Sequence, residues 1–499
     1  MGIVKRQSLL NLISGYIGVF FAAINGLILF PWAFPESPEE MGLVRWVISA
    51  SLLLGAISHL GWPQTIVTYF PRLNPSIHSR IINKGLLASG ICLFTLLLVA
   101  LIIGDPLIDF LMKDHFDSSF WFIFPFAGTY VIFEMYSSQL IHNQNVVLPY
   151  WLKDTGRKLL LTILLIAYGL EFISNLEIFL NLLMLGYAFY ALLIFAVAKK
   201  IKYLSLDQTI MWPKKEMFNY SIVMLMTVGA QMCFGQLDIL MIGSFLGLKE
   251  VAQYSIAFSF GIVVAMPMKA MNASLRPIIS KNVAEENWEN LRNIGMRSLN
   301  AQWIISSFLF LVVLSVSPWI FNLLPESYQG GQSVLFWVAA AQLINVSTGP
   351  SGLVLVASKK YRWELYANLI LILFALIAGA LYIPSGGLKG AAQIFFGAVV
   401  LYNFVKLVAL YWLTGDFWLG IKFFKSFFWF AFPTVLHFLF WNLFFTIDFN
   451  HAILILKAPL YSFIEIFLIL IWTLVGLYIL NLSPDLKKSI NRILNIKRK

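Results

Sequence analysis

The segment MGLVRWVISASLLLGAISHLGWPQTIVTYFPR, residues 41–72, decides the fold class. It is apolar over more than the ~20 residues that one helix needs to cross a bilayer core. Arg45 lies near one end, and a Gly61-Trp62-Pro63 break lies further along. An arginine at the centre of such a helix costs about 2.5 to 3.5 kcal/mol on insertion scales, so it usually lies at an interface, in a cavity or beside a partner. The segment therefore raises the question of what Arg45 does.

The whole chain has the composition of this segment. Of its 499 residues 60% are hydrophobic and only 12% are charged, whereas about a quarter of the residues of a soluble domain are charged. Apolar runs recur from end to end and leave no polar block for a soluble domain. The net charge of +11 comes from basic clusters between the apolar runs, so it indicates topology and excludes nucleic acid as the partner. The chain is an integral membrane protein.

Apolar runs bounded by proline, glycine and charge predict about fourteen transmembrane helices, with all-α structure. Their starts lie near residues 9, 42, 81, 119, 158, 178, 217, 251, 295, 332, 364, 389, 425 and 454. Lysine and arginine cluster at the N-terminus, in every second connection and at the C-terminus. By the positive-inside rule both termini are cytoplasmic, which requires an even number of spans.

The two halves of the chain show a weak repeat. Spans one and two resemble spans seven and eight, and Pro63 and Pro267 interrupt the second member of each pair late. Two parallel six-span repeats followed by two further spans satisfy both this match and the charge pattern, and such repeats usually hold the substrate between them. The predicted parts are an N-terminal lobe 1–200, a C-terminal lobe 201–412, two further spans 413–482, and a basic amphipathic cytoplasmic tail 483–499.

Polar groups inside the spans are the candidates for function. Lys269, Asn272 and Arg276 share a face of span eight and form a cationic ladder toward the cytoplasm. The acids Glu134 on span four and Asp238 on span seven lie deep in their spans. A charge at that depth is costly unless it has a partner or faces a cavity, so both acids are candidates for function.

Simpler interpretations remain open for some of the charges. Arg45 lies about one turn inside its helix and can reach the headgroups by snorkelling. Arg276 can be a topology charge at a helix end, and Lys406 and Glu465 can be structural. A further interruption lies in span ten at Gly349 and Pro350, where freed backbone groups need protein or water.

Enzyme chemistry finds no support in the sequence. There is no His/Cys cluster, no phosphate-binding glycine loop and no Asp-x-Asp pair. We therefore predict no catalytic residues, no metal site and no cofactor, and a transporter rather than an enzyme.

Three stretches resemble the N-terminal region of bacterial polysaccharide flippases. They are Gly2 to Ser8, Glu39 to Arg45, and Leu60 to Pro63 continuing through Tyr69 to Arg72; the segment from Gly247 to Tyr254 is similar to the wider superfamily. These Wzx-like oligosaccharide-lipid transporters are related to the lipid II flippase and to multidrug and toxin extrusion (MATE) transporters. The resemblance implies two MATE-like helical bundles around a central cavity in the bacterial cytoplasmic membrane.

The resemblance also implies a function. Such proteins move undecaprenyl-diphosphate-linked oligosaccharides outward by alternating access, for O-antigen, capsule or exopolysaccharide synthesis. The partners it implies are this lipid-linked substrate, membrane lipids and other membrane proteins of polysaccharide assembly. Alternatives are a multidrug/cation antiporter of the same fold and a membrane-embedded enzyme of glycan assembly.

Two mechanistic hypotheses follow from the charges. Arg45, Lys269, Arg276 and Asn272 would replace the water around the diphosphate. Arg45 and Asp238, on spans two and seven, would pair to close an outer gate. Coupling to protons or sodium ions through Glu134 or Asp238 stays open.

Overall fold

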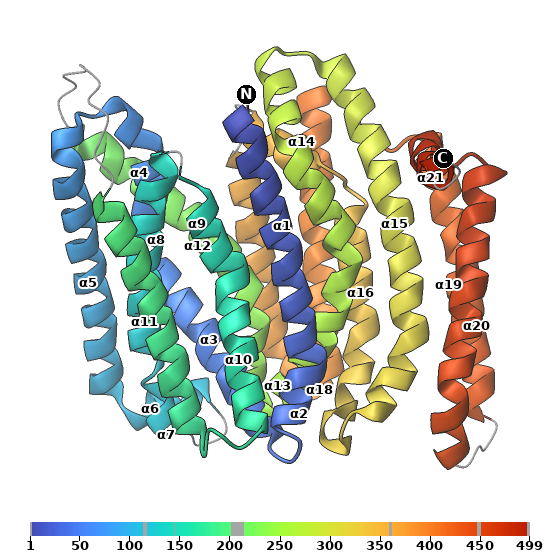
Figure 1. Cartoon of the computed structure of the whole chain (residues 1–499), viewed down its shortest axis with the longest axis horizontal. Coiled ribbons are helices and arrows are strands. Elements are labelled where there is room, and N and C mark those ends of the chain that lie inside the picture. The colour runs from blue at the N-terminus through green and yellow to red at the C-terminus, as the bar shows by residue number, and fades with distance from the viewer. Residues whose placement is uncertain are drawn as a thin grey trace. The chain divides into compact units, whose positions relative to one another are not determined.

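The structure is a computed structural model that describes residues 2–112, 117–143, 145–200, 214–358, 362–446 and 451–496. Every regular element in these residues is helical (Figure 1). Eight helices there are long and apolar enough to cross a membrane, and ten spans result when each of two bent pairs counts as one. The expected all-α polytopic architecture is confirmed.

The first half of the chain forms seven helical segments between its breaks. They are α1 (Gly2–Ile24) with η1 (Asn25–Leu29) and α2 (Phe30–Ala33), α3 (Pro38–Ser58) with α4 (Trp62–Tyr69), α5 (His78–Ile103), α8 (Ile123–His142), α9 (Val147–Tyr150) with η4 (Trp151–Gly156) and α10 (Arg157–Gly169), α11 (Leu176–Lys200), and α12 (Lys214–Phe245). Short connecting helices are η2 (Phe70–Arg72), η3 (Pro75–Ile77), α6 (Asp105–Leu111) and α7 (Asp117–Phe120).

The second half is organised in the same way. Its segments are α13 (Leu248–Gly261) with η5 (Ile262–Ala265) and α14 (Met266–Ala284), α15 (Trp288–Leu323), α16 (Gln332–Val346) with α17 (Ser351–Ala357), α18 (Arg362–Thr414), α19 (Ile421–Thr446) and α20 (His451–Tyr478). The connection η6 (Glu326–Gly331) precedes α16, and the tail helix α21 (Pro484–Ile496) ends the described chain.

Helix α18 counts as two spans. Its 53 residues would extend about 80 Å as a straight helix, more than twice the ~30 Å of a bilayer core. Gly387 interrupts it with φ 58° and ψ −153°, values that no helix has. With this division the described residues form fourteen helical segments between breaks, of which eight to ten pass as membrane spans by length and composition.

Contacts divide the chain into two compact units. Unit 1 comprises residues 1–256 with 375–388, and unit 2 comprises 257–374 with 389–499. The first boundary falls inside α13. The predicted lobes, which rest on topology and not on contacts, stay a prediction.

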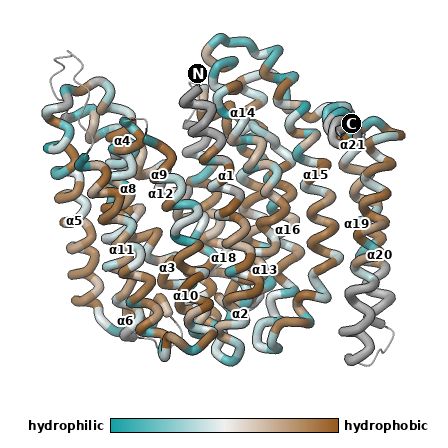
Figure 2. The backbone as a smooth tube through the Cα atoms, in the orientation of Figure 1, coloured by the Kyte–Doolittle hydropathy of each residue, from teal (hydrophilic) through white to brown (hydrophobic). Residues whose placement is uncertain are grey.

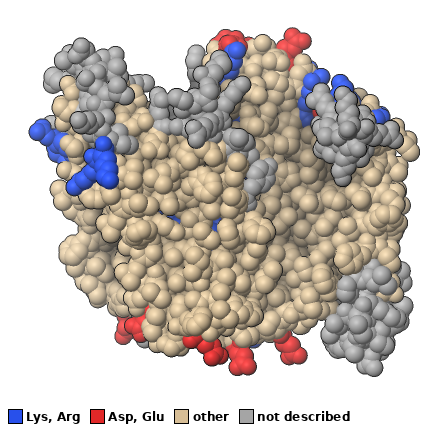
Figure 3. Space-filling model, in the orientation of Figure 1, with Lys and Arg blue, Asp and Glu red and all other residues tan. Residues whose placement is uncertain are grey.

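The ends of the unit 1 helices differ in charge. The beginning of α5 and the short helix α9 lie at one end of the unit, and α2, α6 and α7 lie at the other (Figure 1). In Figure 3 the largest group of lysine and arginine side chains on this side lies toward the end where α5 begins, and acidic side chains line the opposite edge. Along α5 the hydrophobic residues fill the middle of the helix (Figure 2). This distribution is the one that the positive-inside rule produces.

Helices α19 and α20 form a hairpin within unit 2. The rings of Trp429 and Trp472 stack with centroids 4.1 Å apart, and each indole N–H donates to the other residue's carbonyl. Nearby, Nδ1 of His437 lies 2.6 Å from a carboxylate oxygen of Glu465. His437 and Glu465 are thus hydrogen-bonded across the hairpin, inside the spans. This contact agrees with a structural role for Glu465.

Candidate functional site

Four polar side chains gather inside unit 1 around the helix α8. They are Glu134 on α8, Lys153 in the π-helix η4, Arg157 at the start of α10, and Arg45 on α3. We call these four residues the cationic cluster. Tyr187 on α11 lies within electrostatic reach of both Arg157 and Arg45, and α3 and α11 both pack along α8.

The acid of the cluster is paired with a lysine. Nζ of Lys153 lies 2.7 Å from Oε1 of Glu134, and their side chains are 36% and 14% exposed. Arg157 and the imidazole of His59 also lie within electrostatic reach of Glu134. Glu134 therefore neutralises one cation, while Lys153 keeps its outer side accessible.

The two arginines lie against aromatic rings. The guanidinium carbon of Arg157 is 4.5 Å from the ring centroid of Phe133, and it also lies over Tyr130 and Tyr187. That of Arg45 is 4.7 Å from the centroid of Phe30. Ring faces attract a cation without removing its charge. Both arginines are positioned here while their charge stays available to an anion.

The π-helix η4 carries Lys153 into the bundle. It is fixed to α1, because Thr155 and Ser14 bond through their hydroxyls at 2.9 Å, and a Cβ on Gly18 would meet the carbonyl of Asp154. The carbonyl of Gly156 accepts from the hydroxyl of Tyr190 at 3.0 Å. Such π-segments often mark functional sites, because the wider turn redirects side chains.

The cluster carries more positive than negative charge. It contains three cations and the single acid Glu134, inside a bundle where unpaired charge is costly. The buried Nε of Arg45 has no hydrogen-bond partner among the described residues. A site with this balance suits a ligand that brings negative charge.

The two members of the hypothetical outer gate are separately engaged in this structure. Both belong to unit 1. The carboxylate of Asp238 accepts a hydrogen bond of 2.8 Å from the hydroxyl of Tyr254, while Arg45 lies over Phe30. The ion pairs in the described part of the chain do not include Arg45 with Asp238. The gate stays a prediction, and it requires another conformation.

That prediction has a direct test. We expect Arg45→Ala, Asp238→Ala and the double variant to increase labelling of a cysteine near the outer ends of α3 and α12 by a membrane-impermeant maleimide. The double variant should add little to either single one, because each removes the same pair. Unchanged labelling in all three would leave no role for the pair in gating.

The predicted ladder on span eight belongs to unit 2. Lys269 and Arg276 are exposed on α14, seven residues apart on one face. The side-chain oxygen of Asn272 accepts a 3.0 Å hydrogen bond from the buried Gln302 on α15. The ladder is thus accessible and anchored to its neighbouring helix.

The spans are interrupted at the predicted positions. Between α3 and α4, Leu60 and Gly61 have positive φ values, and the hydroxyl of Ser221 on α12 donates to the carbonyl of Leu60. Pro63 is the second residue of α4, and Pro267 is the second residue of α14 after the 3₁₀ turn η5. Protein groups thus satisfy backbone freed inside the bundle.

The interruption in span ten surrounds Gly349 and Pro350, between α16 and α17, which are bent by 54°. The hydroxyl of Thr348 donates to the side-chain oxygen of Asn403 at 2.8 Å, and the ammonium of the buried Lys406 lies 3.3 Å from the same oxygen. Lys406 on α18 thus contacts the group that holds the interruption between α16 and α17, which agrees with a structural role for this lysine.

Sequence reasoning missed Lys153 and Arg157 as site residues, because they belong to a basic connection that fits the topology rule. A weak signal was available. The two residues are four apart and lie within about two turns after Pro149, with apolar sequence on both sides. That pattern is compatible with a helix that enters the bundle with both cations on one face.

Comparisons with known proteins agree on the fold. The MatE family model matches residues 224–381. The chain is similar to a solved structure of the lipid II flippase MurJ in an inward closed conformation, with a TM-score of 0.69, 12% identity, and coverage of 95% of this chain and 99% of the other. No curated protein matches.

Multidrug transporters have similar structures as well. An inward-facing multidrug resistance MATE family transporter of the MOP superfamily has a TM-score of 0.58 at 15% identity, covering 82% of this chain and 95% of its own. The transporter DinF-BH, solved in complex with R6G, has a TM-score of 0.52 at 14% identity, with 84% and 97% covered. The chain therefore has the MATE/MurJ fold of a multi-pass membrane protein.

Proposed function

We propose that this protein is a flippase that moves undecaprenyl-diphosphate-linked oligosaccharides outward across the bacterial cytoplasmic membrane by alternating access, for surface polysaccharide synthesis. The observation that carries the proposal is the cationic cluster, in which Lys153 and Arg157 lie beside the acid Glu134, and Arg45 lies within electrostatic reach of the same Tyr187 as Arg157. A diphosphate cannot cross hydrocarbon with its hydration water, and guanidinium and ammonium groups replace that water with charge-assisted hydrogen bonds. The fold of a lipid II flippase supports a substrate of the same chemistry.

The cluster gives each residue a role in this proposal. Lys153 has the most accessible charge next to Glu134 and binds the diphosphate first. Arg157 and Arg45, held on aromatic rings, bind it once it has entered the bundle. Lys269, Asn272 and Arg276 on α14 form a second candidate site for a diphosphate, within unit 2.

The direction of transport has a physical source. Moving about two negative charges outward across an inside-negative membrane is favourable by roughly 2.3 kcal/mol per charge per 100 mV. The potential alone can thus drive export. Exchange against protons or sodium ions at Glu134 or Asp238 would add to this force.

A cation antiporter of the same fold is the second candidate, because multidrug transporters have similar structures. Such a site needs an acid available to a cationic drug. Here Glu134 is bound to Lys153, and Asp238 accepts a hydrogen bond from Tyr254. These contacts favour an anionic substrate.

Deletion of the gene tests the proposal. We expect loss of surface polysaccharide, with lipid-linked oligosaccharide accumulating on the cytoplasmic face, because the flipping step follows its synthesis there. Restoration by the intact gene is the control. Normal polysaccharide together with raised sensitivity to cationic dyes would instead identify a multidrug antiporter.

A further inference from the structure

The helix α5 exposes one complete face. Its opposite face packs within unit 1, where Ile81 and Ile82 are buried, and a Cβ on Gly85 would meet the side chains of Met135 and Trp62. Only 11% of its membrane-spanning window is buried, against 61% for the neighbouring α3. In a membrane the exposed face of α5 therefore meets lipid.

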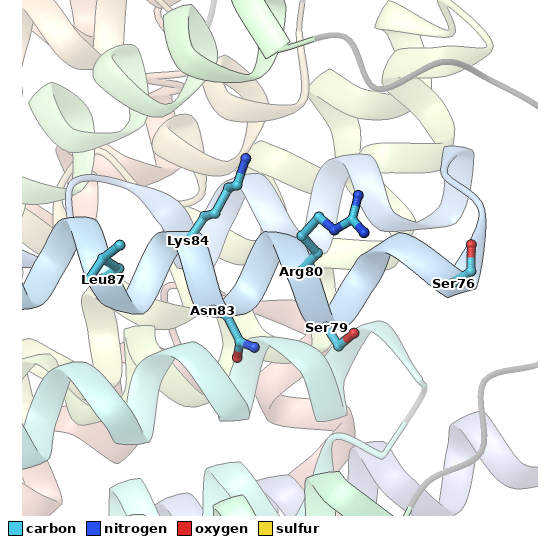
Figure 4. Close-up of a pocket in the computed structure, with 6 residues that line it drawn as sticks. All are labelled: Ser76, Ser79, Arg80, Asn83, Lys84 and Leu87. Carbon is cyan, nitrogen blue, oxygen red and sulfur yellow. The ribbon is translucent and has the colours of Figure 1, made fainter.

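A polar hollow lies where α5 begins (Figure 4). It is lined by Ser76, Ser79, Arg80, Asn83, Lys84 and Leu87. Arg80 and Lys84 point to the same side of the helix in this view. The lining offers two cations together with hydroxyl and amide donors, and it contains no acidic side chain.

The two cations continue into an apolar stripe. Residues 80, 84, 87, 91, 94, 98 and 102 follow one another at intervals of three or four, so they share one face. From Leu87 onward these residues are hydrophobic, and each is at least 41% exposed. The stripe from Leu87 to Ile102 is about 22 Å long, which exceeds the ~15 Å depth of one leaflet's hydrocarbon.

We propose that this face of α5 is a binding site for an anionic phospholipid of the cytoplasmic leaflet. Arg80 and Lys84 bind the phosphodiester, and Ser76, Ser79 or Asn83 bond its remaining oxygens or the hydroxyls of the headgroup. One acyl chain lies along Leu87, Ile91 and Phe94. The proposal does not depend on which substrate the protein transports.

Two features favour a lipid over a free anion. The basic clusters place the beginning of α5 at the cytoplasmic surface, where anionic lipids attract nearby lysine and arginine. The hollow also ends at the exposed Leu87 and continues into the stripe, so a molecule with both a phosphate and a hydrocarbon chain matches its whole length. A free phosphate would leave the apolar part unoccupied.

Photo-crosslinking measures both the place and the identity of the lipid. A benzoyl-phenylalanine replaces Leu87 in the full-length protein, which is reconstituted in vesicles of phosphatidylethanolamine with phosphatidylglycerol as the minor lipid. Mass spectrometry then identifies the lipid bound to the crosslinked residue. We expect phosphatidylglycerol to exceed its bulk share by roughly fivefold or more, since each cation near the surface contributes about that factor.

Control variants locate the effect. Arg80→Gln with Lys84→Gln should return the crosslinked lipid to the bulk composition. Lys199→Gln with Lys200→Gln removes two cations from the end of α11 and should preserve the enrichment. The same crosslinker in place of Ile102, at the far end of the stripe, should report the bulk composition.

Other outcomes would overturn the proposal. Bulk composition at residue 87 in the otherwise unaltered protein would show that the face selects no lipid. An enrichment that survives Arg80→Gln with Lys84→Gln would assign it to other residues. Abolition of the enrichment by excess glycerol phosphate would identify a free-anion site instead.

Discussion

Replacing Arg157 by glutamine should reduce export of lipid-linked oligosaccharide roughly 30-fold or more, with the protein still present in the membrane. Truncating one partner of a buried charged hydrogen-bonded pair costs about 2 to 5 kcal/mol, and about 1.4 kcal/mol corresponds to tenfold. Phe133, Tyr130 and Tyr187 lose only a cation over their faces, so the helices around them stay packed. Surface polysaccharide in a deletion strain carrying the variant is the measurement.

Lys153 needs a different design, because Lys153→Gln leaves Glu134 without its ion pair. Removing one partner of a buried pair can cost several kcal/mol of stability by itself. We therefore compare it with the double variant Lys153→Gln with Glu134→Gln, which carries no unpaired acid. A structural role predicts that the double variant exports normally, and a substrate-binding role predicts that it stays inactive.

Two further variants complete this experiment. Lys153→Arg keeps the charge and should retain much of the export. Lys200→Gln removes an exposed cation at the end of α11, the helix that carries Tyr187, and should export normally. Equal export by Arg157→Gln and Lys200→Gln would exclude the cationic cluster as the substrate site.

The second large effect is expected at Gly61. Gly61→Ala should destabilise the protein by about 2 to 5 kcal/mol, because two costs add. An alanine in the left-handed region costs about 1 to 2 kcal/mol, and overpacking typically costs about 1 to 3 kcal/mol. Both apply here, because Gly61 has φ 72° and its Cβ would lie 2.1 Å from the carbonyl oxygen of Ser221.

The apparent unfolding temperature in detergent measures this effect. Gly90→Ala is the matched control, since Gly90 lies within α5 and a Cβ there has no described atom within 4 Å. We expect the control to be neutral or up to about 1 kcal/mol more stable, because alanine favours helix. If Gly61→Ala unfolds at the same temperature as Gly90→Ala, α4 and α12 are not held together as closely as this contact requires.

Much of the fold could be predicted because the bilayer limits the choices. A chain with apolar runs the length of Leu9 to Phe30, repeated between basic clusters, has only helices available in hydrocarbon. The predicted starts near residues 158 and 178 leave only a short turn between α10 and α11, and Glu171 with φ 63° lies in it. Individual breaks were also visible, since proline at positions 63 and 267 cannot continue a helical hydrogen-bond ladder.

The candidate site could be predicted only in part. Arg45 and Glu134 are visible because a charge within an apolar run is conspicuous. Lys153 and Arg157 are hidden, because a basic connection has the same sequence whether it lies in water or enters the bundle. The difference is made by η4 and by the contact of Gly18 with Asp154, which are distant in the chain.

The sequence by itself determined the class of this protein, its spans and its cytoplasmic clusters, because hydropathy and charge act locally along the chain. Tertiary structure alone decided which charges meet. Glu134 faces Lys153 and Asp238 faces Tyr254, because helix packing sets the partner of each buried group through contacts that no spacing along the chain encodes.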